Sequence, residues 1–163
     1  MADLNPTFEE FVAAETRRLL VLAFAMTGNT HDGWDLTQET LARMAEKWRR
    51  VHTDHGAYAR TVMVRLNIDR LRRLRRELPF GEPPDRAAAP VGLAGEVDAW
   101  LVDGLAALSP KQRTALALRY VEDLDVAGIA DRMGCSVGTA SSHLSRGTER
   151  LRAHARETAG REL

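Results

Sequence analysis

The segment from Asp125 to Arg152 constrains the fold of this chain more than any other part of its sequence. It begins with apolar residues at helical spacing. Gly134 follows and tolerates the left-handed conformation that ends many helices, and Ser136 can cap a second helix. The expected apolar positions are Ile129, Ala130 and Met133 in the first helix and Val137, Ala140, Leu144 and Leu151 in the second. This order predicts a helix-turn-helix, a unit that places its second helix in the major groove of DNA.

The other faces of the second helix carry short polar and basic side chains, which suit contacts to bases and phosphates. The candidate DNA contacts are Thr139, Ser141, Ser142, His143, Ser145, Arg146 and Arg150. We expect Thr139, Ser142 and His143, near the start of the helix, to select sequence, and Arg146 and Arg150 to contact phosphates. The single cysteine, Cys135, falls in the turn, where we expect it to pack as a small apolar residue.

Three further helices are predicted before residue 78. Thr7 and Glu10 form a capping box for the first, which ends at Gly28 and Asn29. The second runs from about His31 to Arg50, with an apolar stripe of Trp34, Leu41, Ala45 and Trp48. After a polar loop from His52 to Gly56, the third runs from about Ala57 to Glu77 and is expected to bury Met63, Val64, Leu71 and Leu74.

The composition changes between Glu77 and Gly95, which contain four of the six prolines. Because proline blocks helix continuation, this stretch reads as a linker. Beyond it we expect a helix from Glu96 to Leu108 and another that begins at Ser109–Pro110 and ends near Tyr120. The predicted fold class is all-α, with two small helical domains over 1–77 and 96–163 joined by a flexible Pro-rich linker over 78–95.

The overall charge of the chain is balanced, with 23 basic and 23 acidic residues. Any affinity for nucleic acid must therefore come from local patches. One cysteine excludes an internal disulfide and suits the cytoplasm. The apolar run Leu19–Met26 falls well short of the ~20 residues of a membrane span, and the N-terminus lacks the pattern of a signal peptide. We therefore expect a soluble cytoplasmic protein that does not insert into a membrane.

An acidic face is predicted on the second helix, where Asp35, Glu39, Ala42 and Glu46 share one side and Gln38 lies beside them. It could be a plain solvated face, a carboxylate pair for acid–base chemistry, or a docking surface for a basic protein. No nucleophile, cleft or metal-ligand set accompanies it in the sequence. Docking through Asp35, Gln38 and Glu39 is therefore the functional interpretation that we retain beside the solvated face.

The third predicted helix has seven arginines between residues 60 and 76 against one acid, Asp69. It is either a solvated basic helix or a nucleic-acid surface, and the excess of Arg over Lys favours phosphate and base recognition. The candidate contacts are Tyr58, Arg65, Asn67, Arg72, Arg73 and Arg76. Trp48 could add a base-stacking surface or belong to the core. His52 and His55 are weak metal candidates, and no metal or cofactor is expected.

Three segments together resemble the extracytoplasmic-function (group 4) sigma factors of bacterial RNA polymerase, most of all the short actinobacterial type. They are TGNTHDGWDLTQETLARMAEKW, YARTVMVRLNIDRLRR and the stretch that begins LSPKQRTALALRY and includes the helix-turn-helix. The resemblance extends over nearly the whole chain, and it rests on the order of these segments and on the short linker between them. The sequence departs from the family pattern at Gly33, Trp34 and Asp125, and at Gly147, where alanine is common and glycine weakens a helix by roughly 1 kcal/mol.

The resemblance implies roles for the candidate residues. Asp35, Gln38 and Glu39 would dock on the β′ clamp coiled coil of core RNA polymerase. The Arg-rich helix would engage the −10 promoter element, and the helix-turn-helix the −35 element. Partners would be core polymerase, through its β′ clamp and β flap, promoter DNA and an anti-sigma factor, without catalysis by the chain. The alternative is a stand-alone helix-turn-helix regulator, but the N-terminal half shows no ligand pocket, phosphoacceptor or dimer seam. An enzyme is the least favoured class.

Overall fold

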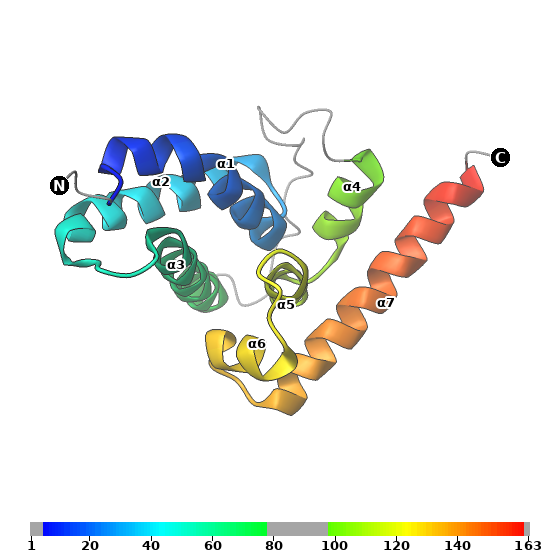
Figure 1. The fold of residues 1–163 in the computed structure, drawn as a ribbon. Helices are drawn as coiled ribbons and strands as arrows, with labels where there is room; N and C mark the ends of the chain where they lie inside the picture. The colour runs from blue at the N-terminus through cyan, green and yellow to red at the C-terminus, as the bar shows by residue number, and fades with distance from the viewer. Residues whose placement is uncertain (1–4, 78–97, 162–163) are drawn as a thin grey trace.

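The computed structural model describes residues 5–77 and 98–161, and in these ranges every regular element is a helix (Figure 1). The predicted all-α fold class is therefore confirmed. The linker predicted over 78–95 lies outside the described residues. The elements are α1 Phe8–Thr27, α2 Thr30–Lys47, the 3-10 turn η1 Trp48–Arg50, α3 His55–Glu77, α4 Ala99–Ala107, α5 Pro110–Tyr120, α6 Val126–Met133 and α7 Val137–Arg161.

Most of the predicted helix boundaries are explained by local hydrogen bonds. The Thr7–Glu10 capping box is present, with distances of 2.9 and 3.2 Å. The Gly28 N–H donates to Phe24 O from a left-handed conformation (φ 71°) and ends α1. A second capping box joins Ser109 to Gln112 at the start of α5. The third helix begins earlier than predicted, at His55, because the Ala57 N–H donates to Asp54 Oδ1.

The apolar stripe predicted for α2 is confirmed only in part, because Leu41 and Trp48 pack against the core but the fully buried residues are others. The buried residues of this helix are Gly33, Leu36, Thr37, Thr40 and Met44, whereas Ala45 is exposed and Trp34, Leu41 and Trp48 are only half-buried. The predicted stripe lies beside the buried side, which includes the apolar Leu36 and Met44, and it also left out threonine as a polar residue. The Thr37 and Thr40 hydroxyls donate to the carbonyls of Gly33 and Leu36, both at 2.8 Å, so they can be buried with their hydrogen bonds satisfied.

The end of α3 is also less buried than predicted. Met63 and Val64 lie in the core, as expected. Leu71 is half-buried and Leu74 is 40% exposed. The helix therefore leaves the body of the protein in its last turns, and its C-terminal part presents mainly arginines to solvent.

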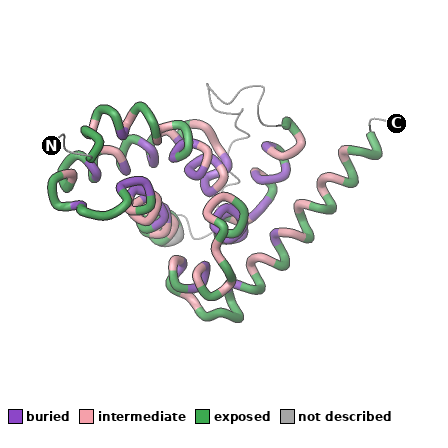
Figure 2. Tube along the Cα trace, in the orientation of Figure 1, coloured by how far each residue is buried: buried purple, intermediate pink, exposed green. Residues whose placement is uncertain are grey.

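The N-terminal unit (α1–α3) packs directly on the C-terminal unit (α4–α7), with α1 against α5 and α3 against α6. Figure 2 shows buried positions on the sides of α1, α3 and α5 that face the middle of the molecule. One apolar core runs through both units, and its largest members include Leu19, Leu22, Met26, Met63, Leu118 and Ile129. A smaller cluster joins Phe24 of α1 to α4 and α5. This contact between the units was not predicted from the sequence.

Arg113 is a buried polar link between the two units, with only 4% of its surface exposed. Its Nε donates to Met26 O at the end of α1 (3.3 Å), and its Nη1 donates to Leu105 O and Leu108 O at the end of α4 (3.2 and 2.9 Å). Helix C-termini carry partial negative charge, which suits a cation there. Burial lowers the pKa of Arg113 to about 10, so the guanidinium stays charged at neutral pH. Gly28 has no side chain and leaves room for it.

Two further polar contacts cross between the units nearer the surface. Arg60 Nε lies 2.8 Å from Glu122 Oε2, and both side chains are nearly buried, at 13% and 11% exposure. Arg132 Nη1 donates to Thr61 Oγ1 at 2.7 Å. The packed arrangement is thus stabilised by directed polar contacts as well as by the shared apolar core.

Gly147 lies at the contact between α7 and α5. A Cβ at this buried position would lie 3.2 Å from Leu116 Cδ1 and 3.3 Å from Gln112 Cβ, tighter than ordinary contacts. The glycine therefore has a packing role in addition to its cost in helix propensity.

We expect Gly147→Val to lower the free energy of unfolding by about 2 kcal/mol, because its branched side chain overpacks the α5–α7 contact. Gly160→Val is the matched control in the same helix, since nothing lies within 4 Å of a Cβ there. Urea denaturation of both variants measures the difference. Equal stability of the two variants would contradict the packing role of Gly147.

Candidate DNA and polymerase interface

The helix-turn-helix is formed by α6 and the first half of α7. Asp125 caps α6 by accepting from the Gly128 N–H (2.8 Å), and Gly134 ends it with φ 65°. Ser136 Oγ accepts from the Thr139 N–H at 3.1 Å and so caps α7. Ile129, Ala130, Met133 and Ala140 are buried, as predicted, and Leu144 and Leu151 are half-buried. Val137 was predicted to be buried but is 55% exposed, because it precedes the turn of α7 that reaches the core.

Nearly all candidate −35 residues lie on the outer surface of α7. The exposed members are Thr139, Ser141, Ser142, Ser145, Arg146 and Arg150. The Thr139 hydroxyl already accepts from Ser136 Oγ at 2.9 Å, so it belongs partly to the cap. His143 is half-buried instead of fully outward. Burial, reinforced by the charges of Lys111 and Arg146, lowers the pKa of His143, so its ring is neutral at pH 7.

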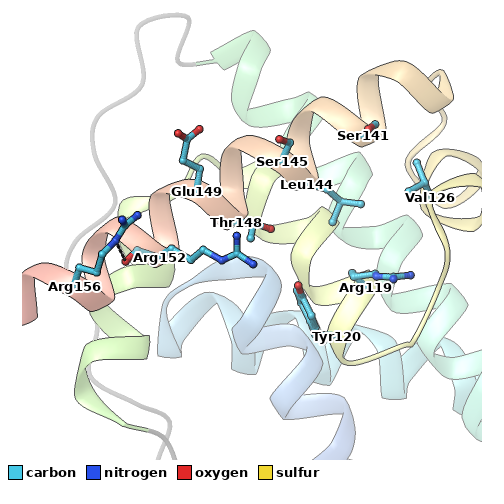
Figure 3. Close-up of a pocket in the computed structure, with 10 residues that line it drawn as sticks. All are labelled: Arg119, Tyr120, Val126, Ser141, Leu144, Ser145, Thr148, Glu149, Arg152 and Arg156. Atoms are coloured by element: carbon cyan, nitrogen blue, oxygen red, sulfur yellow. Dashed lines mark hydrogen bonds between the residues drawn. The ribbon is translucent and has the colours of Figure 1, made fainter. Parts of the chain in front are cut away.

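An open hollow of about 730 Å³ lies beside this surface, and the sequence analysis did not single out its cations (Figure 3). Arg119 at the end of α5 and Arg152 of α7 line it together with Ser141 and Ser145. The helix-turn-helix pattern ends near Arg152, and Arg119 precedes it. No spacing rule therefore connects the two arginines before the chain is folded.

The arginines of α3 divide into exposed and engaged groups. Arg65, Arg72, Arg73 and Arg76 are exposed candidates for the −10 element. Arg60 is held by Glu122, and Arg70 forms an ion pair with Asp32 of α2. Tyr58 is half-buried and packs against the core. The basic surface of α3 is therefore smaller than the run of seven arginines suggests.

Asn67 corrects the sequence analysis. It was a candidate −10 contact, but its side chain is fully buried and Nδ2 donates to Thr114 Oγ1 of α5 at 3.1 Å. In this packed arrangement Asn67 cannot reach DNA. The C-terminal unit supplies the acceptor for its amide N–H, whereas Oδ1 has no hydrogen-bond partner in the described structure. Single-sequence reasoning had no means of placing α5 against α3.

Trp48 and His55 form a structural cluster. Their rings stack with centroids 4.0 Å apart, and Trp48 also makes an edge contact with Phe8 at 5.4 Å. The alternative that Trp48 stacks on bases is not supported by this geometry. His55 is buried under the tryptophan, which leaves it poorly placed to share a metal with His52. Within residues 5–77 and 98–161, no group of three or more potential ligands could hold a metal ion.

The acidic face of α2 lies open to solvent. Asp35, Gln38 and Glu39 are all exposed, and so are Ala42 and Glu46 on the same side. Asp35 lies 3.3 Å from His31 Nε2, with 66% of its side chain exposed. The face is thus open to solvent in the part of the chain that the structure describes. Among the described helices, none is long and apolar enough to cross a membrane.

Two family models match the chain. The model described as "Sigma-70 region 2" matches residues 11–77, and the model described as "Sigma-70, region 4" matches residues 98–151. The chain is 34% identical to the RNA polymerase sigma-E factor of Streptomyces coelicolor, over 89% of this chain and 84% of that protein. It is 30% identical to the ECF RNA polymerase sigma factor SigE of Mycolicibacterium smegmatis, over 94% and 65%.

A solved structure shares the fold. It is the sigma factor RpoE of Bartonella quintana in complex with the anti-sigma factor NepR, with a TM-score of 0.68 and 22% identity over 91% of this chain and 96% of that chain. The two matched regions coincide with the α1–α3 and α4–α7 units, and the relatives extend over both. The chain therefore belongs to the extracytoplasmic-function group of the sigma-70 family of RNA polymerase sigma factors.

Proposed function

We propose that this chain binds core RNA polymerase through the acidic face of α2 and directs it to a particular set of promoters. The observation that carries the proposal is that one chain presents this exposed face together with a helix-turn-helix whose polar side is free. Asp35, Gln38 and Glu39 contact the β′ clamp in this proposal, and the C-terminal unit meets the β flap. In this proposal residues 1–77 and 96–163 form two functional units, joined by a linker.

The DNA contacts are divided between the two units. Tyr58, Arg65, Arg72, Arg73 and Arg76 of α3 face the −10 element, and the outer surface of α7 enters the major groove at the −35 element. The chain supplies recognition and no catalysis of its own. It acts in the cytoplasm with the polymerase, and an anti-sigma factor is a further proposed partner.

The packed arrangement suggests that the free chain is weakly competent for promoter binding. The helix α6 of the helix-turn-helix packs on α3, and a hydrogen bond between Asn67 and Thr114 joins α3 to α5. Two elements of a promoter lie apart along DNA, so simultaneous contact requires the units to separate. Core polymerase would hold them at the required spacing, which raises their effective concentration on the promoter.

Two assays together test the proposed function. Capture with purified core polymerase should recover the chain, and run-off transcription on genomic DNA should reveal a defined promoter set. The free chain should give no footprint at physiological salt until core polymerase is added. A tight footprint from the free chain, without core binding, would instead establish the stand-alone regulator.

Charge reversal on the acidic face gives a residue-level check. Glu39→Lys should weaken core binding by about tenfold at moderate salt, because an exposed charge at an interface rim mainly changes association rate and salt dependence. Titration of labelled chain with core polymerase measures the dissociation constant. Glu157→Lys, an equally exposed change near the far end of α7, is the control. Unchanged binding by Glu39→Lys would reject this face as the docking surface.

A further inference from the structure

Trp34 is a partly exposed tryptophan that does not belong to the core. It is half-buried, yet it packs into neither apolar cluster of the described residues. Within the described structure its ring makes no aromatic contact, and its indole N–H has no hydrogen-bond partner and is not buried. Trp48 of the same predicted stripe differs, because it stacks on His55 and contacts Phe8 and Phe11. The stripe therefore contains one structural tryptophan and one that is available to a partner.

The helix places Trp34 at the edge of the acidic face of α2. Gln38 follows it by four residues, which puts the two side chains on the same side of the helix one turn apart. Asp35 and Glu39 form the next row around the helix, again four residues apart, and both are exposed. Trp34 and the predicted docking residues therefore make one continuous surface, which is aromatic along one edge and acidic beside it.

A surface of this kind fits a long basic side chain. Arginine and lysine can lay their apolar stem on an aromatic ring and carry their charge beyond it to a carboxylate. An arginine guanidinium can also stack on the face of the indole, which attracts cations. Asp35 Oδ2 lies 3.3 Å from His31 Nε2, and 66% of the Asp35 side chain remains exposed to receive such a charge.

Charge selects between the partners that this surface could meet. A second copy of the chain, packed symmetrically through the same face, would set carboxylates against carboxylates, which disfavours a dimer. A basic partner avoids this repulsion, and in the proposed function the partner at this face is the β′ clamp of core polymerase. Because the sequence departs from the family pattern at Trp34, a contact made by this ring is particular to this chain.

We propose that Trp34 is an anchor residue for core polymerase and receives an arginine or lysine side chain of the core enzyme on its indole ring. The inference rests on the proposed function, because it requires the acidic face of α2 to bind core polymerase. Aromatic side chains that lose their water carry much of the energy of many interfaces, whereas exposed charges at the rim set association rate and salt dependence. Trp34 supplies affinity in this division, and Glu39 supplies electrostatic steering.

Titration of the labelled full-length chain with core polymerase, at low and at high NaCl, tests this division. Trp34→Ala should weaken binding by roughly thirtyfold, the scale of a hot-spot residue, and by a similar factor at both salt concentrations, because a desolvated contact is screened little. Trp34→Phe keeps an aromatic ring and should lose much less. Glu39→Lys should lose most of its effect at high salt. Val137→Ala, which removes an exposed apolar side chain from the C-terminal unit, is the matched control and should bind as the wild type does.

Hydroxyl-radical footprinting of the wild-type chain separates a contact from a structural role. The Trp34 ring should be oxidised in the free chain and protected after assembly with core polymerase. Trp48 should change little, because its ring contacts lie within the N-terminal unit. Circular dichroism should show that Trp34→Ala keeps its helices, and if that variant unfolded, the wild-type footprint would decide the question.

The proposal is overturned if Trp34→Ala binds core polymerase as tightly as the wild type while Glu39→Lys binds weakly. It is also overturned if the Trp34 ring is as reactive in the holoenzyme as in the free chain, or if the effect of Trp34→Ala disappears at high salt. If Trp34→Ala and Glu39→Lys both leave core binding unchanged, the acidic face is not the docking surface, and the proposed function itself fails at this point.

Discussion

Arg60→Met should lower the free energy of unfolding by about 3–5 kcal/mol, the range for removing one partner of a buried ion pair. Arg60 is the cation that lies between Glu122 at 2.8 Å and Glu15 at 4.0 Å, and all three side chains are at least partly buried. Glu15 Oε2 and Glu122 Oε1 have no hydrogen-bond partner in the described structure. Without Arg60, two carboxylates would face each other with little solvent. The midpoint of thermal unfolding should fall by about 10 °C.

Two comparisons separate this effect from a general loss of an arginine. Arg65→Met changes an exposed residue of the same helix and should alter stability by no more than about 0.5 kcal/mol. Arg60→Met combined with Glu122→Met should recover much of the loss, because the uncompensated charge is removed as well. Since Arg60 and Glu122 belong to different units, the single variant should also expand in small-angle scattering. A single variant as stable and compact as the wild type would contradict this account of the interface.

Arg113→Met should lower the free energy of unfolding by about 3 kcal/mol. The change keeps an unbranched side chain but removes the guanidinium that donates to the carbonyls of Met26, Leu105 and Leu108; of these, Leu105 O also accepts from the Leu108 N–H. An unsatisfied buried acceptor costs about 1–3 kcal/mol, and acceptors at helix ends can recover part of this by binding water. Chemical denaturation followed by circular dichroism measures the change. Amide exchange at the ends of α1 and α4 should rise most.

Arg113→Lys provides a graded comparison, because lysine keeps the charge but lacks the planar fork that reaches two helix ends together. It should fall between the wild type and Arg113→Met. Arg43→Met, on the exposed side of α2, is the control and should be nearly neutral. If Arg113→Lys matched the wild type, charge alone would account for the site. If Arg113→Met did so, the link that Arg113 makes between the ends of α1 and α4 would have no energetic role.

The local features of the fold could be predicted because neighbouring residues produce them. The Thr7–Glu10 and Ser109–Gln112 boxes and the turn at Gly134 all form as the sequence indicates. Each depends on hydrogen bonds or backbone freedom within a few residues. Errors arose where a polar side chain formed a hydrogen bond within its own helix and could therefore be buried, which the apolar pattern does not show. Thr37 and Thr40 are the clear cases, since polar residues were excluded from the predicted stripe.

The residues of the candidate site also differ in whether their exposure depends on one helix alone or on contacts with distant helices. Asp35, Gln38 and Glu39 and the outer residues of α7 are exposed, as periodicity along a single helix predicts. Asn67 was predicted to face DNA but is buried, because it packs on Thr114 of α5, 47 residues away in sequence. The run of seven arginines likewise does not show that Arg60 and Arg70 are paired with Glu122 and Asp32, which lie in other helices or loops.

The sequence by itself determined the helices, the helix-turn-helix and the family, because these follow from local spacing and from motifs in order. Only the tertiary structure decided that the two units share one core, that Arg113 joins the ends of α1 and α4, and that Arg119 and Arg152 meet in one hollow. The physical reason is that such contacts join residues far apart in the chain. Their free energy depends on burial and on the partner available in the fold, and neither quantity is contained in the spacing of residues along one helix.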